Sequence, residues 1–171
     1  MRYAAIMCLA LIPLVWSGDK LKGLKFRADF FQEICEMLTT VKMRLQFDNP
    51  TTGELIKSLC SKESFKRLSF LSECLSLLKN DDDSFACVWE RSIKSSEMIK
   101  EYLLQDDINA LISFGKTLGT TDTEGQLLIC EKCIEQFSKR KEFSASEKAR
   151  LSKLYLTLAA AGAAVILILL I

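Results

Sequence analysis

The sequence predicts an all-α protein, in which a compact bundle of about six helices is anchored by a transmembrane helix at each end. Apolar residues across the middle of the chain recur three or four positions apart, which is the spacing of one helix face. Only two prolines occur, so no residue after Pro50 covalently forbids a helix. The two ends are apolar, because all charged residues except Arg2 and Asp19 lie between Lys20 and Lys153.

The last stretch of the chain, 154–171, has the length and composition of a membrane span. It contains neither a charge nor a proline. At a rise of about 1.5 Å per residue it reaches roughly 27 Å as a helix, close to the hydrocarbon thickness of a bilayer. A core helix rarely lacks polar residues at its end, and a removable lipid-anchor signal needs a longer and less basic spacer. We therefore expect a carboxyl-terminal transmembrane helix at 154–171.

The amino-terminal stretch, 3–17, is also apolar and has two interpretations. One is a signal peptide cleaved after Ser17, and the other is an uncleaved membrane anchor. The positions of basic residues distinguish these two interpretations, because Lys and Arg are enriched on the cytoplasmic side of a membrane. Only Arg2 precedes the stretch, whereas ten basic residues flank the central region: Lys20, Lys22, Lys25, Arg27, Lys139, Arg140, Lys141, Lys148, Arg150 and Lys153. This pattern favours the uncleaved anchor, and it predicts a cytoplasmic domain at 20–153 with both termini across the membrane.

The first half of the central domain is divided by turn and cap signals. A helix is predicted from Phe26 to the Asp48–Pro50 turn, since its apolar residues keep helical spacing. Thr51 and Glu54 form a capping-box pattern, which predicts a short helix that continues to Cys60. The next helix is predicted where the same spacing returns, at Phe65, Leu68, Leu71, Leu75 and Leu78.

The acidic run Asn80–Asp83 predicts a solvated turn, because it has neither the glycine nor the distal glutamate of a calcium loop. The same run offers an N-cap for a fourth helix, whose apolar positions are Phe85, Val88, Trp89, Ile93 and Ile99. A fifth helix is predicted from Leu104 to Leu118, with Asp106 or Asp107 near its start. Gly115 lies on its apolar face, where glycine costs about 1 kcal/mol relative to alanine. We therefore expect another backbone to pack closely against Gly115.

The segment Gly119–Asp122 predicts a tight turn, with Gly119 suited to a left-handed C-cap. A sixth helix begins either with a Thr121–Glu124 capping box or with Asp122 as its N-cap. A further cap pattern at Ser144–Glu147 leaves a restart of this helix open, and we expect the helix to continue into the 154–171 span. Its apolar stripe consists of Leu127, Cys130, Ile134 and Phe137.

The composition disfavours several classes of function. Histidine, the commonest general base and metal ligand, is absent from the sequence. The net charge of +1 gives no clustered excess of Lys and Arg, so nucleic acid is not an expected partner. Gly115–Lys116–Thr117 resembles the end of a phosphate-binding loop, but Ala110 stands where that loop requires glycine. We therefore expect no catalytic residue, no cofactor and no bound metal.

Cysteine is the remaining residue type that could support a redox reaction or bind a metal. The seven cysteines are an odd number and lie mostly on apolar stripes, which is typical of free thiols in a reducing compartment. Cys130 and Cys133 form a C-x-x-C motif, which makes a thiol-redox or metal-binding membrane protein the alternative function. A zinc site would need two further ligands, and a redox motif would follow a strand at a helix start. Because the pair lies within a predicted helix, core packing is favoured.

The segment Phe114–Gln126 resembles a motif of a known family. It fits the pattern G-x-x-L-G-x-[ST]-D-x-x-x-Q of the stage III sporulation protein AB family. The resemblance extends along the chain, because Trp89 precedes the motif and Lys153–Tyr155 leads into the last apolar stretch in the same order. Two features depart from the family pattern, the many cysteines and the short first apolar stretch. These departures count against the amino-terminal anchor more than against the family.

The resemblance implies a function in endospore-forming bacteria. The family forms part of the mother-cell half of a channel complex between the mother cell and the engulfed forespore. Its helical domain is similar to the inner-membrane platform protein (F protein) of type II secretion and type IV pilus systems. The implied partners are the cognate secretion-type ATPase (stage III sporulation protein AA), other channel proteins of the same operon and membrane lipid; the chain itself leaves a homo-oligomer open.

For this sequence the resemblance implies a non-enzymatic membrane scaffold that docks the ATPase at the mother-cell membrane facing the forespore. The competing hypotheses are the thiol or metal protein and a secreted helical protein cleaved after Ser17. Four residues are expected to build a helix–turn–helix corner: Gly115, Leu118, Gly119 and Asp122. Three polar residues near this corner are the expected partner contacts: Lys116, Glu124 and Gln126.

Overall fold

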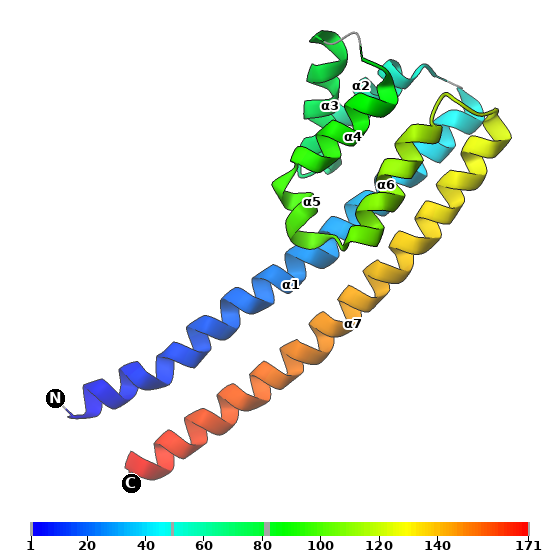
Figure 1. The fold of residues 1–171 in the computed structure, drawn as a ribbon. Helices are drawn as coiled ribbons and strands as arrows, with labels where there is room; N and C mark the ends of the chain where they lie inside the picture. Colours follow the sequence, from blue (N-terminus) through cyan, green and yellow to red (C-terminus); the bar gives the residue numbers. More distant parts are fainter. Residues whose placement is uncertain (1, 49, 81–82, 171) are drawn as a thin grey trace. The chain divides into compact units, whose positions relative to one another are not determined.

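The structure, a computed structural model, describes the backbone of residues 2–48, 50–80 and 83–170. Side chains are described for residues 23, 25–48, 50–79, 83–155, 157, 158, 161 and 162. Over these residues the chain is helical and contains no strand, which confirms the all-α prediction. The helices are α1 (Arg2–Phe47), α2 (Thr52–Cys60), a 3-10 helix (Glu63–Phe65), α3 (Ser69–Asn80), α4 (Phe85–Ser95), α5 (Glu97–Tyr102), α6 (Gln105–Thr117) and α7 (Thr123–Leu170) (Figure 1).

The chain divides into two units. The first consists of Met1–Asp29 with Lys141–Ile171, and the second is Phe30–Arg140, here called the helical domain. Within the helical domain α1 and α7 run antiparallel. The Lys42 ammonium lies 2.7 Å from Glu131 Oε1, while Cys35, two turns earlier in α1, lies against Ser138, two turns later in α7. The two helices therefore form one side of the bundle that holds the other elements.

The core of the helical domain contains buried apolar side chains from every one of its helices. Its largest fully buried side chains are aromatic: Trp89, Phe30, Phe31, Phe70, Phe114 and Phe137. Burial of each such side chain stabilises the fold by roughly 1.5–3 kcal/mol. Trp89 of α4 lies at the centre of the aromatic group, with its ring 5.4 Å from that of Phe70 and 6.0 Å from that of Phe114. The core thus fixes α4 between α3 and α6.

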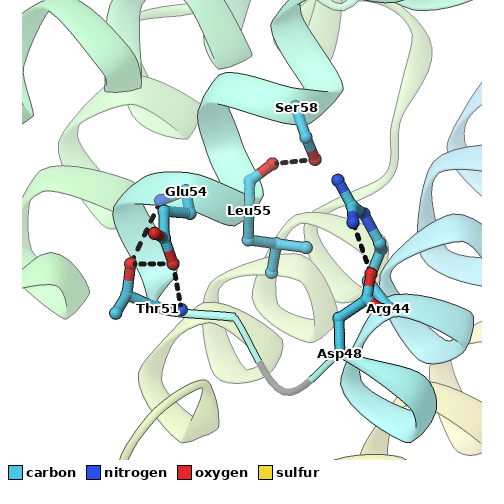
Figure 2. A network of polar contacts seen from close by, with 6 residues as sticks. All are labelled: Arg44, Asp48, Thr51, Glu54, Leu55 and Ser58. Atoms are coloured by element: carbon cyan, nitrogen blue, oxygen red, sulfur yellow. Dashed lines mark hydrogen bonds and ion pairs between the residues drawn. The ribbon is translucent and has the colours of Figure 1, made fainter.

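The start of α2 follows the predicted capping box. Glu54 N donates to Thr51 Oγ1 at 3.3 Å, and Thr51 N donates to Glu54 Oε2 at 3.0 Å, so each residue satisfies the other's backbone (Figure 2). The Thr51 hydroxyl also donates to the same carboxylate at 2.9 Å. Just before this turn, Arg44 pairs with Asp48 at the end of α1. The capping box therefore fixes where the chain leaves the turn after α1.

Two helix boundaries differ from the prediction. Phe65 lies in the 3-10 helix, and α3 begins only at Ser69, because the chain needs a bend between α2 and α3 that a continuous helix would not allow. The predicted fourth helix is two helices. The first of these, α4, ends at Ser95. The second, α5, begins after Ser96, whose Oγ accepts a hydrogen bond from Ile99 N and caps the helix. Helical spacing alone does not reveal such a break, since Ile93 and Ile99 are buried on both sides of it.

Two assignments at helix starts are also corrected. The N-cap of α4 is Ser84 and not a residue of Asn80–Asp83; the turn residues Asp81 and Asp82 lie outside the described residues. Leu104 is the N-cap of α6 and is 49% exposed, whereas it was predicted on the apolar face. Asp107 is completely buried instead. The apolar face of α6 therefore begins later than the spacing of leucines suggested.

The flanking unit, Met1–Asp29 with Lys141–Ile171, is formed by the outer parts of α1 and α7. Each of the two helices is continuous, so α1 starts at Arg2 rather than at Phe26, and α7 does not restart at Ser144. Among the described residues, no helix has a stretch that is both long and apolar enough to cross a membrane. The side chains of the predicted anchor at 3–17, and most of those at 154–171, lie outside the described residues.

Candidate functional site

The corner between α6 and α7 is built around Gly119. Its φ of +77° is in the left-handed region, which glycine adopts without steric cost, and this confirms the predicted C-cap geometry. A Cβ added at Gly119 would lie 3.3 Å from Thr52 Cγ2, so the corner packs closely against the start of α2. Leu118, just before it, is buried in the core. The corner is thereby fixed to a second helix.

The start of α7 is capped by Asp122. Asp122 Oδ1 accepts a hydrogen bond from Gly125 N at 3.2 Å, which selects the Asp122 cap over the Thr121–Glu124 capping box. A Cβ on Gly125 would approach Asp122 Oδ1 to 2.8 Å, so glycine leaves room for the cap. Gln126 Nε2 donates to Thr121 O at 2.8 Å and the side chain is buried. Gln126, predicted as a partner contact, therefore closes the turn.

Gly115 is the close-packing point between α6 and α4. A Cβ at this position would lie 2.0 Å from Trp89 Cδ1, so the indole ring occupies the space that a side chain would need. Trp89 Nε1 donates to Leu111 O at 2.8 Å one turn earlier in α6. The prediction of a close approach is correct, but the neighbour is a side chain rather than a backbone.

Lys116 joins the same two helices on the surface. Its Nζ lies 2.7 Å from Glu90 Oε2, and Lys94 Nζ lies 2.6 Å from Glu90 Oε1. Hydrogen bonds from Lys116 and then Lys94 lower the pKa of Glu90 to about 2. Glu124, by contrast, is exposed and forms no hydrogen bond or ion pair with any described residue. Of the three predicted contacts, Glu124 is thus the one most available to a partner.

A groove of about 450 Å³ opens beside this corner. It is lined by Leu45, Pro50, Thr51, Thr52, Leu55, Ser84, Phe85, Ala86, Leu118, Gly119, Thr120 and Gln126. Figure 2 shows part of its wall, where Leu55 projects beside the Thr51 cap. The residues from α2 and α4 were missed from sequence, because helical spacing does not indicate which helix starts meet. Two of the three walls, the α6–α7 corner and the start of α2, could be predicted as local structures from the Gly119 turn and the Thr51–Glu54 capping box.

The thiols of Cys130 and Cys133 are buried within α7, as core packing predicted. Burial raises the pKa of Cys130 to about 12, with a further contribution from Cys133, and burial raises the pKa of Cys133 to about 11. Both thiols are therefore protonated at neutral pH, which disfavours them as nucleophiles or metal ligands. Within the described part of the chain, no three Cys, Asp or Glu side chains gather in a way that could hold a metal ion.

Comparison with known proteins identifies a family. The family model described as stage III sporulation protein AB matches residues 4–171, which is nearly the whole chain. No curated protein and no solved structure matches.

Proposed function

Since the chain belongs to the stage III sporulation protein AB family, we propose that it is a membrane scaffold of the channel between mother cell and forespore. Its role in sporulation follows from the family. In the proposal the chain docks a cytoplasmic secretion-type ATPase, stage III sporulation protein AA, and couples it to the channel. The mechanism is contact between proteins and requires no reaction on this chain.

The observation that carries the proposal is the groove beside the α6–α7 corner. Its walls come from the start of α2, the start of α4 and the α6–α7 corner. The start of α2 is fixed by its capping box, and the corner is fixed by its close packing against α2. A concave surface on a rigid support suits recognition, because little conformational entropy is lost when a partner binds. Thr120 lines the groove and is exposed, so it can contact a partner, and Glu124 is exposed in the first turn of α7.

The membrane attachment is inferred from the sequence. The uncharged stretch at 154–171 and the apolar stretch at 3–17 serve as anchors, and the basic residues beside them hold residues 20–153 in the mother-cell cytoplasm. Both termini then lie across the membrane that faces the forespore. In this arrangement the chain also contacts membrane lipid and other channel proteins of the same operon. It can further associate with other copies of itself.

The test is copurification of the full chain with the cognate ATPase in an uncharged detergent. Binding at micromolar concentration supports the proposal, and its absence counts against it. A tag fused to either terminus should be accessible from the outer side of the mother-cell membrane and protected from the cytosol. Tags that react only from the cytosol would contradict the proposed topology.

A further inference from the structure

We propose that a basic cleft on α7, at the start of the uncharged stretch 154–171, binds the phosphate group of an anionic phospholipid. The cleft has a volume of about 470 Å³ and is lined by Ala149, Arg150, Lys153, Leu154 and Thr157. The inference rests on the proposed membrane attachment, and it adds the class of lipid that the attached chain binds. It does not depend on the ATPase.

The residues of the cleft share one face of α7. Arg150, Lys153, Leu154 and Thr157 occupy positions i, i+3, i+4 and i+7, which are neighbours on the surface of a helix. Both cations are exposed, so each can reach a ligand in the cleft. Thr157 Oγ1 donates to Leu154 O at 2.8 Å, which directs this hydroxyl to the backbone. The two cations are therefore the groups that would bind an anion.

The two cations are not neutralised by other described side chains. Earlier on α7, Lys139 and Arg140 are each paired with a carboxylate. Arg150 and Lys153, by contrast, form no ion pair with any described residue. Glu147, the last acidic residue of the sequence, precedes Arg150 by three positions but does not pair with it in the described structure. Both positive charges therefore remain available to a ligand.

The wider surroundings do not cancel this charge. The flanking unit contains nine basic and four acidic residues, whereas the helical domain contains fourteen basic and eighteen acidic residues. The helix macrodipole acts only within the first and last turns of a helix, and α7 extends from Thr123 to Leu170, so neither of its ends lies near the cleft. The cleft thus carries a net positive charge that attracts an anion.

Exposed apolar side chains adjoin the two cations. Leu154 is 51% exposed, and Leu158, one turn later, is 60% exposed. No charged residue follows Lys153, so the basic cleft and the uncharged stretch meet at this point of the chain. A phospholipid presents complementary groups in the same order, a phosphate followed by hydrocarbon. Beside a membrane span, each Lys or Arg strengthens binding to anionic lipid by roughly fivefold.

Other partners match only part of this surface. A nucleic acid or an acidic peptide would pair with the cations but would leave Leu154 and Leu158 exposed to water. Phosphatidylcholine has both a phosphate and hydrocarbon, but its choline group carries a positive charge that Arg150 and Lys153 would repel. The matching ligand is a phospholipid with a net negative headgroup, such as phosphatidylglycerol.

The experiment measures lipid binding to the full chain in an uncharged detergent by native mass spectrometry. The probes are phosphatidylglycerol, phosphatidylcholine with the same acyl chains, and glycerol phosphate, which has no acyl chain. We expect phosphatidylglycerol to bind at least about tenfold more tightly than either of the other two. If phosphatidylcholine or glycerol phosphate binds as tightly as phosphatidylglycerol does, the inference is overturned.

Paired double variants test the location of the site. Arg150→Gln with Lys153→Gln removes both cations at exposed positions and should weaken phosphatidylglycerol binding about ten- to thirtyfold. The matched control, Lys57→Gln with Lys132→Gln, removes the same charge at exposed positions of the helical domain and should bind as the wild type does. Equal binding by these two double variants would overturn the assignment to the cleft.

A charge-conserving variant tests whether the loss is electrostatic. Arg150→Lys with Lys153→Arg keeps both cations in the cleft and should retain most of the binding. If it binds as weakly as the double glutamine variant, the cations do not act through their charge, and the inference is overturned.

The outcomes distinguish this inference from the proposed function. The wild-type chain is also reconstituted into phosphatidylcholine vesicles and extracted with alkali. If the chain is extracted, the membrane attachment is contradicted and the inference is overturned with it. If it remains inserted but shows no preference for phosphatidylglycerol, the attachment is supported and only the inference is overturned. If the ATPase does not copurify, docking is contradicted, while selective phosphatidylglycerol binding in the same preparation still supports the cleft.

Discussion

Trp89 occupies the space beside Gly115, so that α4 and α6 approach each other at a point where only glycine fits. The indole Cδ1 is 2.0 Å from the position that a Cβ on Gly115 would take. The same ring donates its N–H to Leu111 O, which fixes the ring along α6. This contact supports the helix that leads into the α6–α7 corner, and it explains why the first glycine of the motif lies inside a helix.

Replacement of Gly115 by alanine should destabilise the protein. Alanine gains about 1 kcal/mol of helix propensity, but overpacking against a fully buried indole costs more. We expect a net loss of up to about 2 kcal/mol in the free energy of unfolding, measured by urea denaturation of the full chain in detergent. The control is Gly53→Ala on α2, where no neighbour lies within 4 Å of the new Cβ and a small gain is expected. Equal effects of the two substitutions would contradict the packing argument.

The Glu90 carboxylate predicts a pH dependence of stability. Its pKa is lowered to about 2 in the folded protein by Lys116 and Lys94, whereas an unfolded glutamate titrates near ~4.3. The stabilisation is therefore complete above the unfolded pKa, and it is lost as the pH falls from about 5 to 2. Wild type should lose more stability over this interval than Glu90→Gln, most clearly at low salt. Parallel pH profiles for the two proteins would show that the ion pairs contribute nothing measurable.

The cysteines should differ in reactivity. Cys87 is exposed, whereas Cys130 and Cys133 are buried and their pKa values are raised by burial to about 12 and about 11. In the native protein at neutral pH, iodoacetamide should modify Cys87 well before the other two, as followed by mass spectrometry. In denaturant the three rates should converge. Rapid native modification of Cys130 or Cys133 would instead support the thiol-chemistry hypothesis.

Asp107 joins α6 to α7 from within the core. Its Oδ1 accepts hydrogen bonds from Gln136 Nε2 at 3.1 Å and from Arg140 Nε at 3.0 Å, and the residue is fully buried. Asp107→Ala should destabilise the protein by about 1–3 kcal/mol, because both donors lose a charged acceptor. Asp106→Asn, which changes an exposed residue in the same turn, should change stability by less than about 0.5 kcal/mol. Thermal unfolding of both variants gives the comparison.

The features that could be predicted from the sequence are those set by nearby residues. The Thr51–Glu54 capping box and the left-handed Gly119 depend on hydrogen bonds and backbone angles within a few positions. The burial of Cys130 and Phe137 follows from helical spacing, because residues spaced in this way share one face of a single helix. These interactions are encoded without reference to the rest of the fold.

The features that were missed depend on contacts between distant segments. Asp107 looked like an ordinary residue of a first helical turn, and its burial is possible only because α7 supplies Arg140. The groove has the same origin, since its walls are the starts of helices separated by more than thirty residues along the chain. Their meeting is determined by the core and by no local pattern.

The most direct test of the docking account is a photo-crosslink in sporulating cells. A photoreactive amino acid is placed at Thr120, which is exposed and lines the groove, and in a matched chain at Ser113 on α6, which is exposed but outside it. The account predicts an adduct with the sporulation ATPase from position 120 and little or none from position 113. It is contradicted if position 120 gives no ATPase adduct, or if both positions give the adduct equally, while the two chains are present at the same level.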